Sequence, residues 1–131
     1  MKRILVLLSL VIFTLSVQAQ KQEWKEMHAF HAVMGKSFHP AEEGKLQPLK
    51  DSAASLVKRA IEWQKSVVPQ GYNKEVTAPI LKNLVAKCKE VQAAVKAKKD
   101  DATLTKLITE AHEIFHEIME KCRKEDSHDH H

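Results

Sequence analysis

The chain has 131 residues, of which 44% are hydrophobic and 5% aromatic, and its formal net charge is +4 at pH 7. A chain of this length suits a single domain with a modest hydrophobic core. Lysine and glutamate are interspersed and aromatic residues are sparse, which excludes a nucleic-acid-binding patch. The densest basic run, residues 96–99, is typical of a solvated helix end.

Residues 1–19 have the three parts of a secretory signal peptide. A Lys-Arg pair at residues 2–3 precedes an apolar run over residues 4–15, and Val17-Gln18-Ala19 forms the expected cleavage site. The apolar run is shorter than a membrane-spanning helix requires. We therefore expect cleavage after residue 19, a periplasmic or secreted protein, and no membrane span in the mature chain.

Residues 20–125 are predicted to form one helical domain. The whole sequence has only three glycines and four prolines, and apolar residues recur at spacings of three and four. The glycines and prolines divide the domain into segments at about 21–37, 49–68, 77–98 and 102–124. Four helices joined by short links favour an all-α fold, specifically an antiparallel up-down-up-down four-helix bundle.

The first two segments carry apolar stripes that should face the core. The stripe of the first segment comprises Trp24, Met27 or His28, His31, Met34 and Phe38. The stripe of the second comprises Leu49, Ala53, Leu56, Ala60, Trp63 and Val67. Alternating spacings of three and four are typical of a helix that packs in a bundle. Because His31 falls within the first stripe, we expect its imidazole to point inward.

The last two segments begin at polar residues. Thr77 is the predicted N-cap of the third segment, with Pro79 tolerated in its first turn, and Asp101 is the predicted N-cap of the fourth. The inward residues of the third segment are predicted to be Ile80, Leu84, Cys88, Val91 and Val95. Those of the fourth are predicted to be Leu104, Ile108, Ala111, Phe115, Ile118 and Cys122.

The two cysteines, Cys88 and Cys122, need a test for a disulfide because an exported protein meets an oxidising environment. If the last two helices fold back on each other near residue 100, the cysteines lie about 13 Å apart along the bundle. A disulfide requires Cα atoms within about 7 Å of each other. We therefore expect no intrachain disulfide, which leaves buried thiols, an intermolecular disulfide, or Cys122 as a soft metal ligand.

Two histidine pairs form the predicted metal site. His28 and His31 lie three residues apart in the first segment, and His112 and His116 lie four residues apart in the last. In a helix, a spacing of four separates two residues by about 6 Å along the axis and about 40° around it. In a bundle of equal-length helices the start of the first helix faces the end of the last, so both pairs share one layer. Three or four imidazoles are sufficient for a Zn, Cu, Ni or Fe site.

Each histidine also has a simpler explanation, as an exposed or hydrogen-bonded surface residue. Two facing pairs on apolar stripes favour a ligand, because a buried imidazole without a partner costs free energy. His39, before Pro40, is interpreted as a cap or a loop contact. Residues 126–131 are predicted to be a disordered charged tail, and the alternative is a tail whose three histidines capture Zn, Ni or Cu ions weakly. The predicted layer also has possible sulfur ligands in Met27, Met119 and Cys122.

Two stretches, Glu23-Trp24-Lys25-Glu26-Met27-His28 and Ala111–Cys122, together resemble the four-helix cytochromes, that is, the soluble periplasmic b type and cytochrome c-prime. The resemblance spans about residues 22–124 and implies a haem between the first and the last helix. His116 matches the position of the histidine ligand in the b type. Met27, or His28, matches the position of the methionine ligand.

One departure from these cytochromes limits the kind of haem. Cytochrome c-prime attaches haem through Cys-x-x-Cys-His, whereas the corresponding stretch His112-Glu113-Ile114-Phe115-His116 contains no cysteine. This departure excludes covalent haem and leaves non-covalent haem b, with Phe30, Phe38 and Phe115 as pocket residues. A haem needs only two axial ligands, whereas this layer offers four histidines. We therefore expect a bare ion slightly ahead of haem, for metal binding or electron transfer.

Other classes of function have less support in the sequence. Di-iron bundles use two Glu-x-x-His motifs and two further carboxylates, whereas this chain has only Glu113-x-x-His116. No nucleophile lies in a recognisable setting, so we predict that the protein is not an enzyme. The alternative is a metal-free exported bundle for protein interaction or stress response. An apolar outer face at Ala29, Phe30 and Val33 would permit a homodimer.

Overall fold

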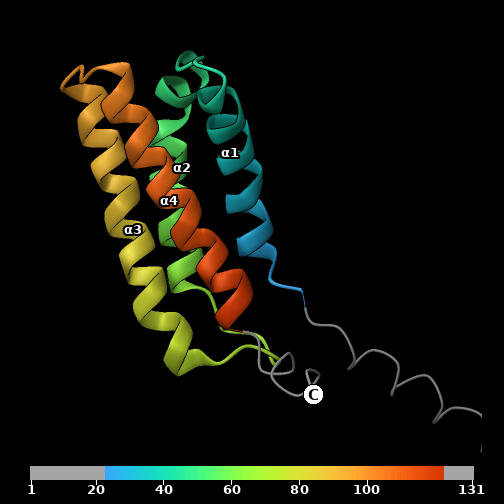
Figure 1. The fold of residues 1–131 in the computed structure, drawn as a ribbon. Helices are drawn as coiled ribbons and strands as arrows, with labels where there is room; N and C mark the ends of the chain where they lie inside the picture. Colours follow the sequence, from blue (N-terminus) through green and yellow to red (C-terminus); the bar gives the residue numbers. More distant parts are fainter. Residues whose placement is uncertain (1–22, 123–131) are drawn as a thin grey trace, which may run out of the picture.

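The computed structural model describes residues 23–122, which form four α-helices and contain no strand. The helices are α1 (Lys25–Glu42), α2 (Gln47–Lys65), α3 (Lys74–Lys96) and α4 (Asp101–Lys121). They pack side by side as a bundle (Figure 1). The predicted all-α fold is confirmed. The predicted signal peptide and His-rich tail lie outside the described residues.

Each helix packs on its neighbour in the chain, and α1 packs on α4. The α1–α4 pair is the least closely packed of the four. The Trp24 indole, at the start of α1, donates a 2.8 Å hydrogen bond from Nε1 to Ser66 Oγ, just past the end of α2. The Asn73 backbone N–H, before α3, donates a 2.7 Å hydrogen bond to the carbonyl of Cys122, just past α4. The ends of α2 and α4 are therefore tied to the starts of α1 and α3.

Two N-caps differ from the predicted ones by a few residues. Asn73, rather than Thr77, caps α3, because its side chain accepts hydrogen bonds from the N–H groups of Glu75 and Val76. Thr77 lies in the first turn, where its hydroxyl donates to the carbonyl of Asn73. Asp100, rather than Asp101, caps α4 and accepts a 2.9 Å hydrogen bond from the N–H of Thr103. A hydrogen bond with the Thr103 side chain lowers the pKa of the Asp100 carboxyl, and the hydrogen bond from the Thr103 N–H lowers it further.

Aromatic rings form the centre of the core. Trp63 lies 5.7 Å from Trp24, 5.6 Å from Phe30 and 5.9 Å from Phe115 between ring centroids. All four side chains are at most 1% exposed. Phe30 and Phe115 join α1 to α4, with centroids 5.8 Å apart. The Trp63 indole Nε1 is buried and has no hydrogen-bond partner among the described residues.

Most predicted core positions are confirmed, and the errors have simple causes. All six inward residues predicted for α4 are buried. Val67 is 87% exposed because α2 ends at Lys65, so Val67 is no longer on the helical stripe. Phe30 is fully buried in the core and cannot form the outer face proposed for a homodimer. No helix in residues 23–122 is long and apolar enough to cross a membrane.

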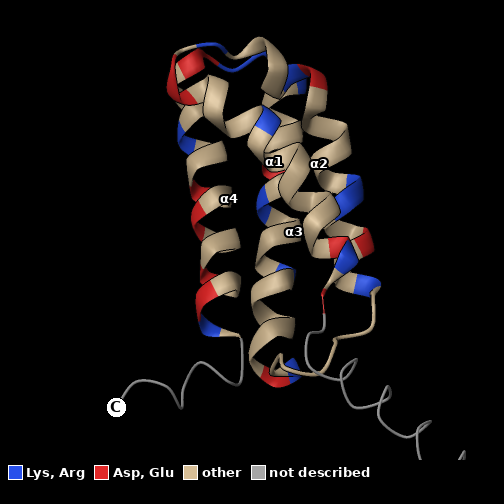
Figure 2. Cartoon of the chain, turned by 90° about the vertical axis from the view of Figure 1, so that its right-hand side faces the viewer, with Lys and Arg blue, Asp and Glu red and all other residues tan. Residues whose placement is uncertain are grey.

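Basic and acidic residues both occur along the helices of the bundle (Figure 2). The Nζ of Lys87 in α3 lies 3.0 Å from Glu110 Oε1 in α4 and 2.8 Å from Glu90 Oε1. The hydrogen bond to Glu90 raises the pKa of Lys87, and the one to Glu110 adds to it. Partly exposed ion pairs of this kind contribute little to stability, so the buried core carries most of the packing energy between the helices.

Both cysteines are free and buried in the structure. Burial raises the pKa of the Cys88 thiol to about 12. Burial also raises the pKa of Cys122, and a hydrogen bond with Thr77 partly opposes this shift. A thiol with a raised pKa carries little of the thiolate form that binds soft metals, so neither cysteine is a ready ligand.

Replacement of the central ring should test the role of the aromatic core. We expect Trp63→Ala to lower the free energy of unfolding by roughly 3–5 kcal/mol, because it leaves a large cavity. Val67→Ala, at an exposed position, should change it by less than about 0.5 kcal/mol. Guanidinium denaturation followed by circular dichroism measures both values, and equal losses would contradict the assigned core.

Thiol reactivity should test the burial of the cysteines. In the folded protein at pH 8 we expect almost no reaction of Cys88 with a disulfide reagent, because its pKa of about 12 leaves it protonated. Both thiols should react once the chain is unfolded in guanidinium. Rapid labelling of Cys88 under native conditions would show that the thiol is accessible.

Candidate metal centre

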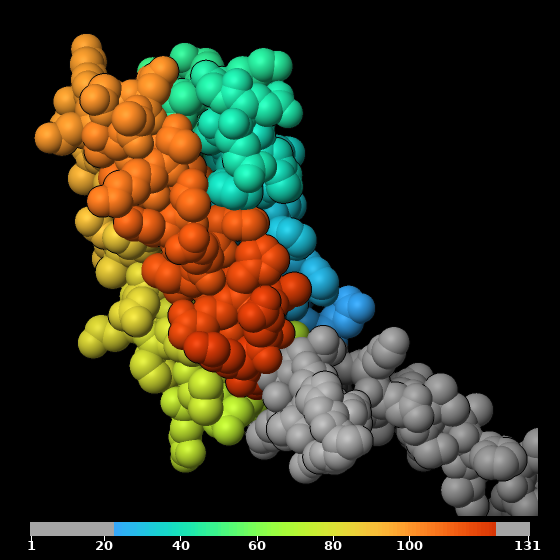
Figure 3. Space-filling model, viewed as in Figure 1, coloured from blue at the N-terminus to red at the C-terminus, as the bar shows by residue number. Residues whose placement is uncertain are grey.

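The five described histidines lie on the first and the last helix. His28, His31 and His39 belong to α1, and His112 and His116 belong to α4. His112 is half-buried and the other four are exposed. Figure 3 shows the face on which α4, in orange and red, lies beside α1, in teal and blue. The candidate centre is therefore on the surface rather than in the interior layer that the sequence predicted.

The prediction that His31 points inward is wrong. The buried stripe of α1 runs through Met27, Phe30, Met34 and Phe38, so Phe30 takes the place in the core that was assigned to His31. A large apolar ring gains more free energy from burial than an imidazole, which must find hydrogen-bond partners. His31 instead lies against the edge of the core, with its ring centroid 4.9 Å from that of Phe115.

His112 is the central residue of the cluster. Its ring is stacked on Phe38 of α1, with centroids 3.8 Å apart and planes 9° apart. The His116 ring lies 4.5 Å away on the same helix, at 73° to the His112 ring. Partial burial lowers the pKa of His112 below its ordinary value of 6.5, and His116, His39 and His31 lower it further, with Glu42 opposing. His112 is therefore neutral at pH 7, which is the state that binds metals.

A continuous row of ring contacts crosses from α1 to α4 and back. The contacts join His39 to Phe38, Phe38 to His112, His112 to His116, His116 to Phe115, and Phe115 to His31. We call its four imidazoles the histidine seam, comprising His31, His39, His112 and His116. The seam follows the α1–α4 contact, which is the loosest in the bundle.

Of the predicted ligands, three belong to the seam and one lies elsewhere. The structure brings His31, His112 and His116 together in the row of rings. His28 instead lies beside Glu23, with Nε2 3.5 Å from Oε1. Both side chains of this pair are exposed.

His39 is the seam residue that the sequence analysis missed. Residues 39–44 were interpreted as a connection because of Pro40, but α1 continues through Pro40 to Glu42. The spacing of His31, Gly35 and His39, each four residues from the next, could have placed all three on one face. The His39 Nδ1 atom lies 3.6 Å from Glu42 Oε1.

The seam offers two imidazoles that could chelate an ion, rather than a complete set of protein ligands. Within residues 23–122, no three His, Cys, Asp or Glu side chains are grouped closely enough to hold an ion. His112 and His116 have the four-residue spacing of a chelating pair, with ring centroids 4.5 Å apart, and further ligands would come from water or from rotation of an exposed imidazole. A site with open positions exchanges its ion more readily than a closed tetrahedral one.

The predicted haem ligands, Met27 and His116, lie in different surroundings. Met27 is 6% exposed, and its Sδ atom accepts a 3.9 Å contact from the Tyr72 hydroxyl. His116 is exposed. The core between α1 and α4 is filled by Phe30 and Phe115, so a porphyrin there would have to displace packed rings.

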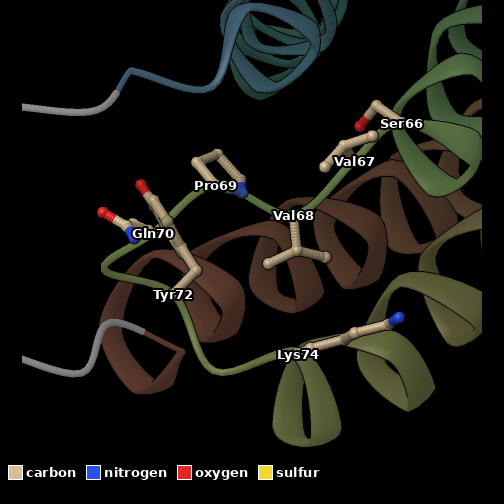
Figure 4. A pocket seen from close by; sticks show the side chains of 7 residues that line it. All are labelled: Ser66, Val67, Val68, Pro69, Gln70, Tyr72 and Lys74. Atoms are coloured by element: carbon tan, nitrogen blue, oxygen red, sulfur yellow. The ribbon is translucent and has the colours of Figure 1, made fainter.

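Two hollows lie away from the seam. One, of about 490 Å³, is at the connection between α2 and α3, where Val68, Pro69 and Tyr72 line it (Figure 4). The other, of about 510 Å³, lies between α1 and α2 and is lined by charged side chains such as Lys25, Arg59 and Glu62. No histidine lines either hollow.

Comparison with known proteins finds no family model, no curated protein and no solved structure that matches the chain. The resemblance to four-helix cytochromes therefore stays a prediction from the residue pattern.

The titration of His112 should show the influence of its neighbours. We expect its midpoint below 6.5, and we expect His116→Gln to move it upward because that change removes a nearby positive charge. Since the folded-state pKa is lowered, the stabilising effect of neutral His112 is complete above pH 6.5 and is lost as the pH falls through the folded-state pKa. NMR of the imidazole C–H signals measures the midpoint, and a value at or above 6.5 would contradict the structure.

Proposed function

We propose that this protein is an exported four-helix bundle that reversibly binds a divalent transition-metal ion between α1 and α4. The observation that carries the proposal is the pair His112 and His116, whose ring centroids lie 4.5 Å apart on an accessible helix face. Two imidazoles at this spacing can bind one ion together, with water in the remaining positions. The ion is Zn, Cu, Ni or Fe, because imidazole nitrogen suits these metals.

The surroundings of His112 favour metal binding at neutral pH. A metal competes with protons for imidazole, so a lowered pKa of His112 reduces this competition. The Phe38 ring that stacks on His112 also limits the orientations of the imidazole. A ligand that is already oriented loses less conformational entropy when it binds.

The proposal includes the finer architecture and the location of the protein. An antiparallel up-down-up-down order of helices is supported by the ties between helix ends, Trp24 to Ser66 and Asn73 to Cys122. Export is supported by the pattern of residues 1–19. We propose no catalytic role, since the seam holds no carboxylate pair or activated nucleophile.

Non-covalent haem b is the less favoured cofactor. It is supported by the sequence resemblance, which places His116 and Met27 at the ligand positions. The burial of Met27 against Tyr72 and the filled space between α1 and α4 favour the bare ion. A metal-free bundle is the remaining alternative, and it is compatible with the lack of a three-residue metal group within residues 23–122.

Metal titration should test the proposal directly. The protein should be prepared with His128, His130 and His131 replaced by asparagine, so that the tail cannot bind the ion. We expect Zn²⁺, Ni²⁺ and Cu²⁺ to bind one per chain in calorimetry, with Cu²⁺ tightest. At about 100 times the dissociation constant, the ion should stabilise the fold by about 2.7 kcal/mol, seen as a higher melting temperature.

Single substitutions should locate the site. His112→Ala and His116→Ala should each weaken binding by at least about tenfold, because a chelate loses half of its donors. His28→Ala is the matched control and should leave binding unchanged. A Soret band after addition of haem, lost in His116→Ala, would favour the haem reading. Absence of both metal and haem binding would favour the metal-free bundle.

A further inference from the structure

We propose that His39 is the third protein ligand of the ion and that Gly35 provides the space in which the ion sits. His39 binds through Nε2, and Glu42 orients the ring from the other side. This inference rests on the proposed function, because it adds a third imidazole to the pair His112 and His116.

Gly35 leaves an opening on the face of α1 between His31 and His39. A Cβ atom built at Gly35 would meet only one atom within 4 Å, the His39 Cδ2 at 3.8 Å, which is an ordinary van der Waals distance. No close approach of another helix therefore requires glycine at this position. Glycine weakens the interior of a helix relative to alanine. The absence of a side chain at Gly35 leaves space for a ligand beside His39.

A carboxylate lies beside the His39 ring, on the same face of α1. Its Nδ1 atom lies 3.6 Å from Glu42 Oε1, one turn along α1. This contact leaves Nε2 as the free donor. In metal sites, a carboxylate that pairs with one imidazole nitrogen fixes the ring orientation and makes the other nitrogen a better donor.

The position of His39 brings it within reach of the chelating pair. Phe38 stacks on His112 at 3.8 Å, and the His39 ring lies 5.5 Å from the Phe38 ring. The side chain of His39 is 68% exposed, so its ring can rotate without leaving a packed site.

His31 is the competing candidate, and its packing disfavours it. Its ring lies 4.9 Å from Phe115 at an interplanar angle of 30°, a contact between α1 and the core. Rotation of His31 toward the ion would lose this contact, whereas rotation of His39 would change only its longer contact with Phe38, at 5.5 Å between centroids. The third ligand is therefore His39, which lies one turn after Gly35 on α1.

Three imidazoles from two helices would let one ion link these helices. His39 belongs to α1 and His112 and His116 to α4, so one ion would join the least closely packed pair of helices. The fourth position would stay open to water, as in zinc sites with three histidines. Metal binding would then hold α1 on α4.

The test compares two substitutions at Gly35 in the full chain with the three tail histidines replaced by asparagine. Gly35→Ala should raise the melting temperature and keep Zn²⁺ affinity within about twofold, because one methyl group leaves most of the space. Gly35→Leu should keep the fold but weaken Zn²⁺ binding by at least about tenfold, because the leucine side chain would fill the space beside His39. Equal affinity of the two variants would overturn the role of Gly35.

The ligand itself is tested by His39→Ala, with His31→Ala as the matched control on the same helix. His39→Ala should weaken Zn²⁺ binding at least about tenfold, and Glu42→Gln should weaken it about tenfold. His31→Ala should change it less than about twofold. If His31→Ala costs as much as His39→Ala, or if His39→Ala has no effect, the inference is wrong.

The spectrum of Co²⁺ separates this inference from the proposed function. A three-imidazole site should give the intense visible bands of four-coordinate Co²⁺, and His39→Ala should reduce them to the weak bands of a hydrated ion. Co²⁺ or Zn²⁺ binding that depends on His112 but not on His39 would preserve the proposed function and reject His39. Binding that is unaffected by either substitution would reject both.

Discussion

The packing of Phe30 against Phe115 fixes how α1 and α4 are turned toward each other. These two rings, with Trp24 and Trp63, occupy the centre of the core and are at most 1% exposed. Once Phe30 and Phe115 face inward, the residues beside them on each helix must lie at the edge of the α1–α4 contact. His31 and His116 are such neighbours. The position of the histidine seam is therefore a result of aromatic packing and not of metal binding.

The sequence predicted the fold well because helix formation depends on local spacing. The stripe of α4 was predicted without error, since apolar residues at every third or fourth position leave one choice of face. Boundaries were less accurate. Residues 66–68 were expected in a helix, yet α2 ends at Lys65, and Pro40 was expected to end α1, yet the helix continues to Glu42. A proline near the end of a helix loses only one hydrogen bond, which explains why the helix can contain it.

The candidate site was predicted only in part, and the missing part depends on helix rotation. The pair His112 and His116 follows directly from the sequence, since a spacing of four defines a shared face. Whether His31 or Phe30 faces the core depends on a rotation of α1 by one residue, about 100°. An apolar stripe that contains both aromatic and imidazole rings does not define that rotation. His39 was missed for a second reason, because the end of α1 was placed too early.

The unpaired indole nitrogen of Trp63 gives the protein an internal optical reporter. Both indoles are buried, and the Trp24 ring meets Trp63 edge-on, at an interplanar angle of 88°. The Trp63 nitrogen has no hydrogen-bond partner among the described residues, so its fluorescence should respond mainly to the rings packed around it. A change in the α1–α4 contact would move Phe30 and Phe115 relative to this indole. A change at the surface between α1 and α4 would then alter the fluorescence of the buried Trp63.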